Sequence, residues 1–214
     1  MPVIRARLLS LWRSMSGIAM TEFALCLPFV VMLGTLGIEY TRYIVVKKRV
    51  SDIAAQIADN ASRMGNASVL TNKPVSEAEI NDLFIGATME AGDQMDLPHK
   101  SRIILSSLEI NGDNGQWIHW QRCFGSKSYA SHYGVEGDGE TGTAFEGMGR
   151  AGSKIMAVKG SAVMFVEMSY SYTPVIGLLP VSMQDIVEVS AYNVRDSRDL
   201  SQIYPVTGIT KSAC

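Results

Sequence analysis

The sequence has no excess of positive charge: 19 lysine and arginine residues stand against 21 acidic ones, giving a formal net charge of −2. Proteins that bind nucleic acid usually carry a basic patch, so we expect no nucleic-acid partner. Charged residues make up only 19% of the chain and hydrophobic residues 47%. This balance excludes an intrinsically disordered chain and leaves apolar residues for both a core and a membrane segment.

Common catalytic and metal-binding motifs are also missing. The three histidines show neither HExxH spacing nor a CxxC companion, so we expect no metal site and no cofactor. Residues 147–152 fit GxGxxG, but no predicted strand leads into them and no predicted helix follows. The acidic segment Gly134 to Glu140 is predicted to be a solvated loop, with binding of a hard cation such as calcium as the alternative. We therefore predict that the protein is not an enzyme and has no small-molecule substrate.

One long apolar run lies near the start of the chain. Phe23 to Ile38 is sixteen residues without a charge, and Glu22 alone interrupts the longer run from Ile18 to Ile38. At ~1.5 Å per residue the longer run spans roughly 30 Å, the thickness of the hydrocarbon core of a bilayer. The run predicts a single-pass transmembrane helix in contact with membrane lipid, with a buried core helix as the alternative.

A carboxylate inside such a run indicates a function. Glu22 would cost ~2.5 to 3.5 kcal/mol near the centre of a bilayer and less near its edge, so it requires a partner. A free α-amino group is one candidate, and cleavage after Gly17 would create it at Ile18. The competing interpretation is a secretory signal peptide cleaved near Gly37, but Glu22 and the unbroken pattern after Gly37 argue against it.

The segment from Ser16 to Pro28, SGIAMTEFALCLP, resembles the TadE-like minor pilins of tight-adherence (Tad) pilus systems, which are relatives of type IV pilins. The resemblance covers about residues 5 to 64. It rests on the basic leader ending in Gly17, on Glu22 and Phe23 at the fifth and sixth positions after it, and on the apolar run that follows.

This resemblance implies a function in assembly. A membrane prepilin peptidase would cleave between Gly17 and Ile18, and Glu22 would pair with the free N-terminus of a neighbouring subunit. The chain would then be a pseudopilin of a Tad (Flp-type) pilus with a role in adhesion or biofilm formation. The implied partners are other pilins and pseudopilins, the inner-membrane assembly platform and the prepilin peptidase.

The helical pattern continues beyond the apolar run. Val46, Val50, Ile53 and Ile57 recur at steps of three and four, and Gly65 is a suitable cap. We therefore divide the chain into a leader (1–17), one transmembrane and amphipathic helix (18–64) and a periplasmic α+β domain (65–214). The predicted fold class is α+β and pilin-like, with the long helix packed on a small antiparallel sheet.

Within 65–214 the patterns predict a second helix and several strands. Pro74 to Ser76 opens the helix, Ser76 and Glu79 form a capping box, and Gly92 lies at its end. The turn residues 111–115 predict a hairpin. Alternation predicts strands at 102–110, 116–122, 155–158, 161–172 and 185–195.

Basic residues flank both ends of the span, so their count does not decide its orientation. We place the short leader in the cytoplasm and the domain in the periplasm of a bacterial inner membrane, with the pilus as a further, extracellular location. Cys26 lies in the apolar run, which leaves Cys123 and Cys214 in an oxidising compartment. We predict a disulfide between them; two unrelated free thiols are the alternative.

Two other functional classes fit the same outline. One is a membrane-anchored periplasmic binding module that never enters a filament, and failure of cleavage at Gly17 would favour it. The other is an anchored periplasmic enzyme, which would require a deep pocket with convergent polar groups.

Overall fold

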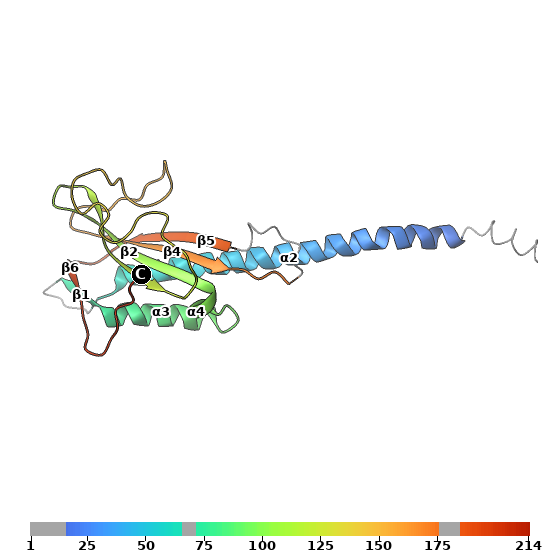
Figure 1. The fold of residues 1–214 in the computed structure, drawn as a ribbon, viewed down its shortest axis with the longest axis horizontal. Helices are drawn as coiled ribbons and strands as arrows, with labels where there is room; N and C mark the ends of the chain where they lie inside the picture. Colours follow the sequence, from blue (N-terminus) through green and yellow to red (C-terminus); the bar gives the residue numbers. More distant parts are fainter. Residues whose placement is uncertain (1–15, 66–71, 176–184) are drawn as a thin grey trace, which may run out of the picture. The chain divides into compact units, whose positions relative to one another are not determined.

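A computed structural model describes residues 16–65, 72–175 and 185–214 of the chain. The predicted leader therefore lies outside the described residues, apart from Ser16 and Gly17. The α+β prediction is confirmed (Figure 1). The elements in chain order are α2 (Ser16–Arg63), β1 (Lys73–Ser76), α3 (Glu77–Ala91), α4 (Leu97–Lys100), β2 (Ser101–Ile110), β3 (Gln116–Phe124), β4 (Val163–Ser171), β5 (Asp185–Asn193) and β6 (Arg198–Tyr204).

The chain divides into two compact units. One consists of residues 1–44 and 174–179, and the other of residues 45–173 and 180–214. We call residues 17–44 the apolar half of α2 and residues 45–63 its domain half. The second unit contains the domain half of α2 and the strands β1 to β6, and we call it the domain.

The domain is built on a four-stranded antiparallel sheet with the strand order β3-β2-β4-β5, beside a two-stranded parallel pair of β1 and β6. The predicted hairpin joins β2 to β3, and the N–H of Asn111 donates to the carbonyl of Gly115 across the turn. A Cβ atom at Gly115 would lie 2.1 Å from the carbonyl oxygen of Gly142, so only glycine fits there.

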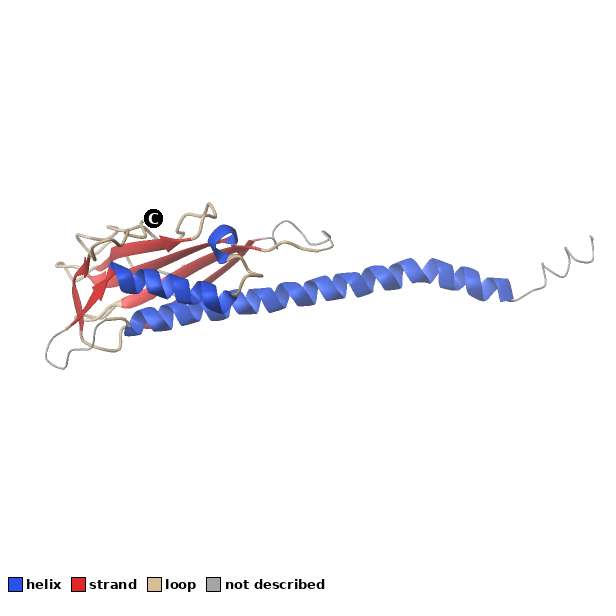
Figure 2. Cartoon of the chain, turned by 90° about the horizontal axis from the view of Figure 1, so that it is seen from below, coloured by secondary structure: helices blue, strands red, loops and turns tan. Residues whose placement is uncertain are grey.

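One face of the sheet packs against the domain half of α2 and against α3 (Figure 2). Phe124 of β3 stacks on Phe84 of α3, with the ring centroids 5.5 Å apart. The register places Phe124 opposite Ile103, which lies opposite Met168 on the other side. Alternate residues of β2, β3 and β4 therefore face the helices. Of the predicted apolar stripe of α2, Val50, Ile53 and Ile57 are at most 1% exposed, whereas Val46 is only partly buried. Three alanines of the same half are buried as well: Ala54, Ala58 and Ala61.

The segment 125–162 packs on the opposite face of the sheet. A second apolar cluster forms there around Phe165 and Val163 of β4, and it includes Met148 and Ala157 of the segment. As a result, β4 is buried on both faces from 163 to 170. Glu167 is among these buried residues, and its carboxylate accepts hydrogen bonds from the segment.

One prediction of local structure is wrong. Residues 155–158 form only an isolated bridge between Met148 and Ile155, because the side-chain amide of Gln116 takes the place of a strand ladder. Its Oε1 accepts from the N–H of Ala157 at 2.7 Å, and its Nε2 donates to the carbonyl of Ala157 at 3.1 Å. Residues 73–76, which precede the predicted helix, form the short strand β1, and α3 begins directly after its N-cap Ser76, as the capping box predicted.

The predicted capping box is present. The N–H of Glu79 donates to the hydroxyl of Ser76, the carboxylate of Glu79 accepts from the N–H of Ser76, and Gly92 caps the other end of α3. No local pattern indicated β6, whose Arg198 caps α2. Its Nη2 donates to the carbonyls of Ala61 at 2.8 Å and Met64 at 2.9 Å. Burial lowers the pKa of Arg198 to about 10, and the carbonyl end of the helix favours its positive charge.

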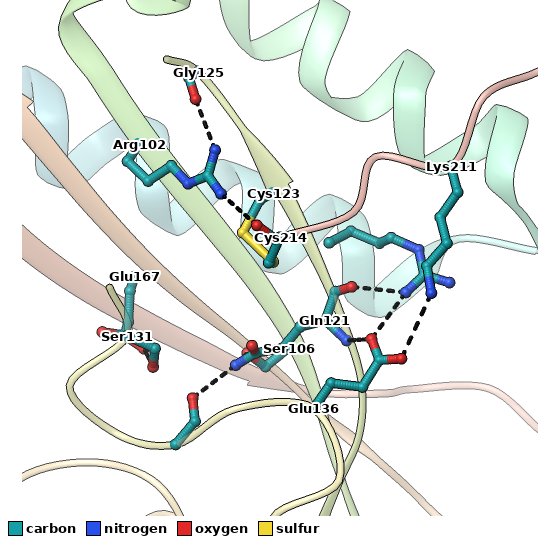
Figure 3. Close-up of a disulfide and its surroundings, with 12 residues drawn as sticks. Arg102, Ser106, Gln121, Cys123, Gly125, Ser131, Glu136, Glu167, Lys211 and Cys214 are labelled. Atoms are coloured by element: carbon teal, nitrogen blue, oxygen red, sulfur yellow. Dashed lines mark hydrogen bonds and ion pairs between the residues drawn. A yellow bond between two sulfur atoms is a disulfide. The ribbon is translucent and has the colours of Figure 1, made fainter. Parts of the chain in front are cut away.

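The predicted disulfide between Cys123 and Cys214 is confirmed and joins residues 91 positions apart. Around it the C-terminal tail lies along β3 (Figure 3). The N–H of Cys123 donates to the carbonyl of Ser212 at 2.8 Å, and Arg102 donates to the carbonyl of Cys214 at 3.2 Å. The disulfide therefore fixes the end of the chain to the sheet.

Candidate assembly segment in helix α2

The predicted cleavage site lies in the first described turn of α2. Gly17 and Ile18 are both exposed there. Among the described residues, and apart from the helix's own neighbouring backbone, no atom lies within 4 Å of the position that a Cβ atom would take at Gly17. The described residues therefore leave the bond between Gly17 and Ile18 uncovered.

Glu22 and Phe23 follow one turn later and are also exposed. Ile18 and Glu22 are four residues apart, and such residues lie on the same face of a helix, with Cβ atoms roughly 5 to 6 Å apart. Within the described part of the chain, no hydrogen bond or ion pair involves the Glu22 carboxylate. The group that balances its charge must therefore come from outside the described chain.

The threonine side chains of this half bond to their own helix. The hydroxyls of Thr21, Thr35 and Thr41 donate to backbone carbonyls three or four residues earlier, at 2.8, 2.9 and 2.8 Å. Such bonds remove the cost of placing a hydroxyl in an apolar medium. Glu22 thus differs from every threonine of the apolar half.

The apolar half exposes hydrophobic side chains on every side. Residues 29–33 cover more than one turn, and each has an exposed fraction between 49% and 67%. The helix is long and apolar enough to cross a membrane, and the side chains of its most apolar window are not buried. A helix that is hydrophobic all round needs an apolar surrounding, which indicates membrane anchoring.

Glu39 is a second carboxylate of this half, and it contrasts with Glu22. Its exposed fraction is 1%, and its Oε2 accepts from the N–H of Val175 at 3.1 Å. Glu39 is not among the residues that the sequence motifs single out. Its place directly after the apolar run was the signal that could have singled it out.

The remaining candidates are dispersed over the domain. His99, His119 and His132 contact Asp96, Glu109 and Tyr129 respectively, in three separate places. Among the described residues no group of three or more histidine, cysteine or acidic side chains is placed to hold a metal ion.

In the acidic loop the carboxylates bond to nearby protein groups. Glu136 accepts from the N–H of Gln121 at 2.8 Å and from Arg122 at 3.2 Å, and Asp138 accepts from the N–H of Val135 at 2.8 Å. The structure therefore gives these acids a role in holding the loop to β3.

Comparison with known proteins gave a match to helix α2, over both its apolar half and its domain half. A family model described as TadE-like protein matches residues 17–65. Neither the curated proteins nor the solved structures gave a match. The predicted TadE-like resemblance is confirmed over the matched residues, and it associates the chain with Tad pilus proteins.

Proposed function

We propose that this chain, whose N-terminal helix is TadE-like, is a minor pilin of a Tad pilus. In this proposal, the prepilin peptidase cleaves it after Gly17, and Glu22 then pairs with other pilins during assembly. The protein contributes to adhesion or biofilm formation through the filament. TadE-like pilus proteins are structural rather than enzymatic, which agrees with the absence of catalytic motifs from the sequence.

The exposed Glu22 carboxylate is the observation that carries this proposal. Cleavage would give Ile18 a free α-amino group at the positive end of the helix dipole. A carboxylate and an amine are each costly alone in hydrocarbon, whereas a close pair is tolerated. Since Glu22 has no partner in the described chain, the N-terminus of a neighbouring pilin would supply the charge. Phe23, with an exposed fraction of 62%, would extend the same contact with apolar surface.

The disulfide supports the proposed orientation. Structural disulfides persist in oxidising compartments such as the periplasm and are rare in the bacterial cytosol. The Cys123–Cys214 bond therefore favours a domain outside the inner membrane and a cytoplasmic N-terminus. In this orientation the leader faces the peptidase, and the domain is available to the assembly platform and to sister pilins.

The first test is the N-terminus and intact mass of the membrane protein from cells with and without the prepilin peptidase. We expect a chain that begins at Ile18 only when the peptidase is present. Gly17→Val should block cleavage, whereas Gly34→Val is a matched control. At both glycines no described atom outside the helix's own neighbouring backbone lies within 4 Å of the position that a Cβ atom would take, so neither substitution creates a clash with the described residues. An uncut chain in the presence of the peptidase would instead support a membrane-anchored periplasmic binding module.

The second test separates cleavage from assembly. Glu22→Ala should be cleaved normally but should be lost from the sheared pilus fraction and from complexes with sister pilins. Glu22→Asp keeps the charge and should retain part of the incorporation. Incorporation of Glu22→Ala at the level of the natural chain would contradict the proposed role of the carboxylate.

A further inference from the structure

The two outer strands of the four-stranded sheet differ in how their edges are covered. On β3 the outward N–H groups have acceptors: Ile118 donates to the carbonyl of Asp138 at 2.9 Å, Gln121 to the Glu136 carboxylate at 2.8 Å, and Cys123 to the carbonyl of Ser212 at 2.8 Å. The acidic loop and the disulfide-bound tail thus cover this edge, and Figure 3 shows Glu136 beside the backbone of β3. A covered edge is unavailable for pairing with another strand.

The outer edge of β5 is open among the described residues. The N–H of Val194 donates to the carbonyl of Ala162 at 2.9 Å, so the even-numbered residues direct their backbone groups toward β4. Val187, Val189 and Ala191 then direct their N–H and C=O groups away from the sheet. Within the described ranges, no backbone or side-chain group bonds to them on that side.

A cavity of ≈ 220 Å³ lies beside this edge, on the face of the sheet that the segment 125–162 covers. Tyr133, Ile155, Val187 and Val189 provide apolar walls, and Arg150 lies at the cavity as its basic residue. A strand that paired with β5 would direct alternate side chains toward this face. One of them would reach the cavity.

The charges around the edge favour an acidic partner. The carboxylate of Asp185 is 2.7 Å from Lys127, and that of Glu188 is 3.7 Å from Lys47, so both acids of β5 are paired. The Arg150 side chain is exposed and has no ion pair within the described chain. The charge left uncompensated at the cavity is therefore positive.

We propose that the open edge of β5 binds an extended segment of a partner protein as a fifth strand. Main-chain hydrogen bonds to Val187, Val189 and Ala191 give the affinity, as in other cases of strand addition. An apolar side chain enters the cavity, and a neighbouring carboxylate of the segment pairs with Arg150. This partner site is separate from the Glu22 contact and does not depend on cleavage at Gly17.

The geometry disfavours a second copy of this chain as the partner. Lys47 contacts Glu188 and Asp59 contacts Arg195, so the domain half of α2 runs in the same direction as β5. Antiparallel pairing of two β5 strands would turn the two α2 helices in opposite directions. That arrangement requires two domains in opposite orientations, which disfavours it.

The probe for this site is a fluorescent nine-residue peptide that alternates valine with threonine and carries one glutamate. The full chain in detergent micelles should bind it saturably in fluorescence anisotropy. In a paired strand only every second backbone N–H points toward β5. N-methylation of these amides removes their hydrogen bonds and should weaken binding about tenfold. N-methylation of the amides between them, which point away from β5, should leave binding unchanged. Equal effects of the two patterns, or no saturable binding, would overturn the proposal.

Variants of the chain test the same edge. Val187→Lys should weaken binding about tenfold by placing a charge at the cavity, whereas Val158→Lys, at an exposed valine outside it, is the matched control. Arg150→Glu should reverse the preference between the glutamate peptide and its lysine counterpart. Circular dichroism checks that each variant is folded. If Val187→Lys and Val158→Lys bind the peptide with equal affinity, the proposed site is wrong. If the natural chain forms a dimer that Val187→Lys abolishes, the edge of β5 binds a second copy of the chain instead.

Discussion

The two halves of α2 meet opposite conditions within a single helix. In the apolar half, Leu33 is 67% exposed, whereas Ile53 in the domain half is 1% exposed beneath the sheet. The domain half obtains its apolar surroundings from the same chain. Residues 17–34 of the apolar half must obtain them from lipid or from other helices, because all of them are exposed in the described chain.

Glu22 of the apolar half and Arg122 of the domain show the same contrast. Glu22 has no partner within the described chain, whereas Arg122 of the domain is 4% exposed and has its charge matched. Its Nη2 lies 2.6 Å from the Glu77 carboxylate at the start of α3. The domain is therefore stable through its own contacts, whereas Glu22 would be paired only by the assembly contact that we propose. Matched substitutions in the two parts should separate these roles.

The disulfide should give the largest difference. Cys214→Ser removes the disulfide between residues 91 positions apart. The chain-entropy model predicts that the loss of a loop of this size lowers the unfolding free energy by about 4 to 5 kcal/mol. Cys26→Ser in the apolar half should leave the unfolding free energy unchanged. Chemical denaturation of the full chain in detergent, followed by tryptophan fluorescence, measures both. Equal midpoints for the two variants would show that the tail does not contribute to stability.

The buried ion pair should give the next largest effect. Arg122→Met leaves the buried Glu77 carboxylate without its partner, and breaking such a pair costs about 3 to 5 kcal/mol. Adding Glu77→Gln should recover part of that loss, because the unpaired charge is then removed. Glu22→Gln is the control in the apolar half and should not change domain unfolding. No recovery in the double variant would mean that Arg122 acts through packing instead.

Truncating apolar side chains tests the comparison directly. Ile53→Ala should lower the unfolding free energy of the domain by about 2 to 5 kcal/mol, because it creates a cavity in the core. Leu33→Ala should change it by less than about 0.5 kcal/mol. Thermal unfolding in detergent measures both variants. A similar loss at the two positions would contradict the separation of the two halves.

The smallest expected effect concerns pH and the buried Glu167. Its carboxylate accepts from the hydroxyl of Ser131 and, at 3.1 Å, from the N–H of His132. Burial raises the pKa of Glu167 above its ordinary value, and these hydrogen bonds oppose the shift. Because the pKa of Glu167 is higher in the folded state than in the unfolded state, its protonation stabilises the fold. This contribution is fully present when the pH is below the pKa of the unfolded state, and it is lost as the pH rises through the pKa of the folded state.

Comparing the natural chain with Glu167→Gln isolates that contribution. The natural chain should gain stability relative to the variant as pH falls from neutral toward the ordinary carboxylate range. Asp185→Asn should show the opposite sign, because the hydrogen bond from Lys127 lowers the pKa of Asp185 and its contribution is lost as pH falls. Unfolding free energies measured across this pH range provide the check. A pH-independent difference for Glu167→Gln would contradict the raised pKa.

Local patterns predicted much of this fold. The 3.6-residue periodicity located α2, the Ser76 capping box located the start of α3, and alternation located the central strands, because each depends on neighbouring residues alone. The segment 155–158 has the composition of a strand but not the structure. Its backbone partner is the side chain of Gln116, about forty residues away, and no local pattern records such a contact.

By itself the sequence determined that α2 contains an apolar run long enough to span a membrane, that Glu22 lies within this run, and that the segment is TadE-like. Apolar length and a charge within an apolar run can be recognised without tertiary contacts. Only the tertiary structure decided that Arg198 caps α2, that Glu39 is buried while Glu22 is exposed, and that, over the described residues, β3 is covered while β5 is open. These features depend on which residues, far apart in the chain, come together in the fold.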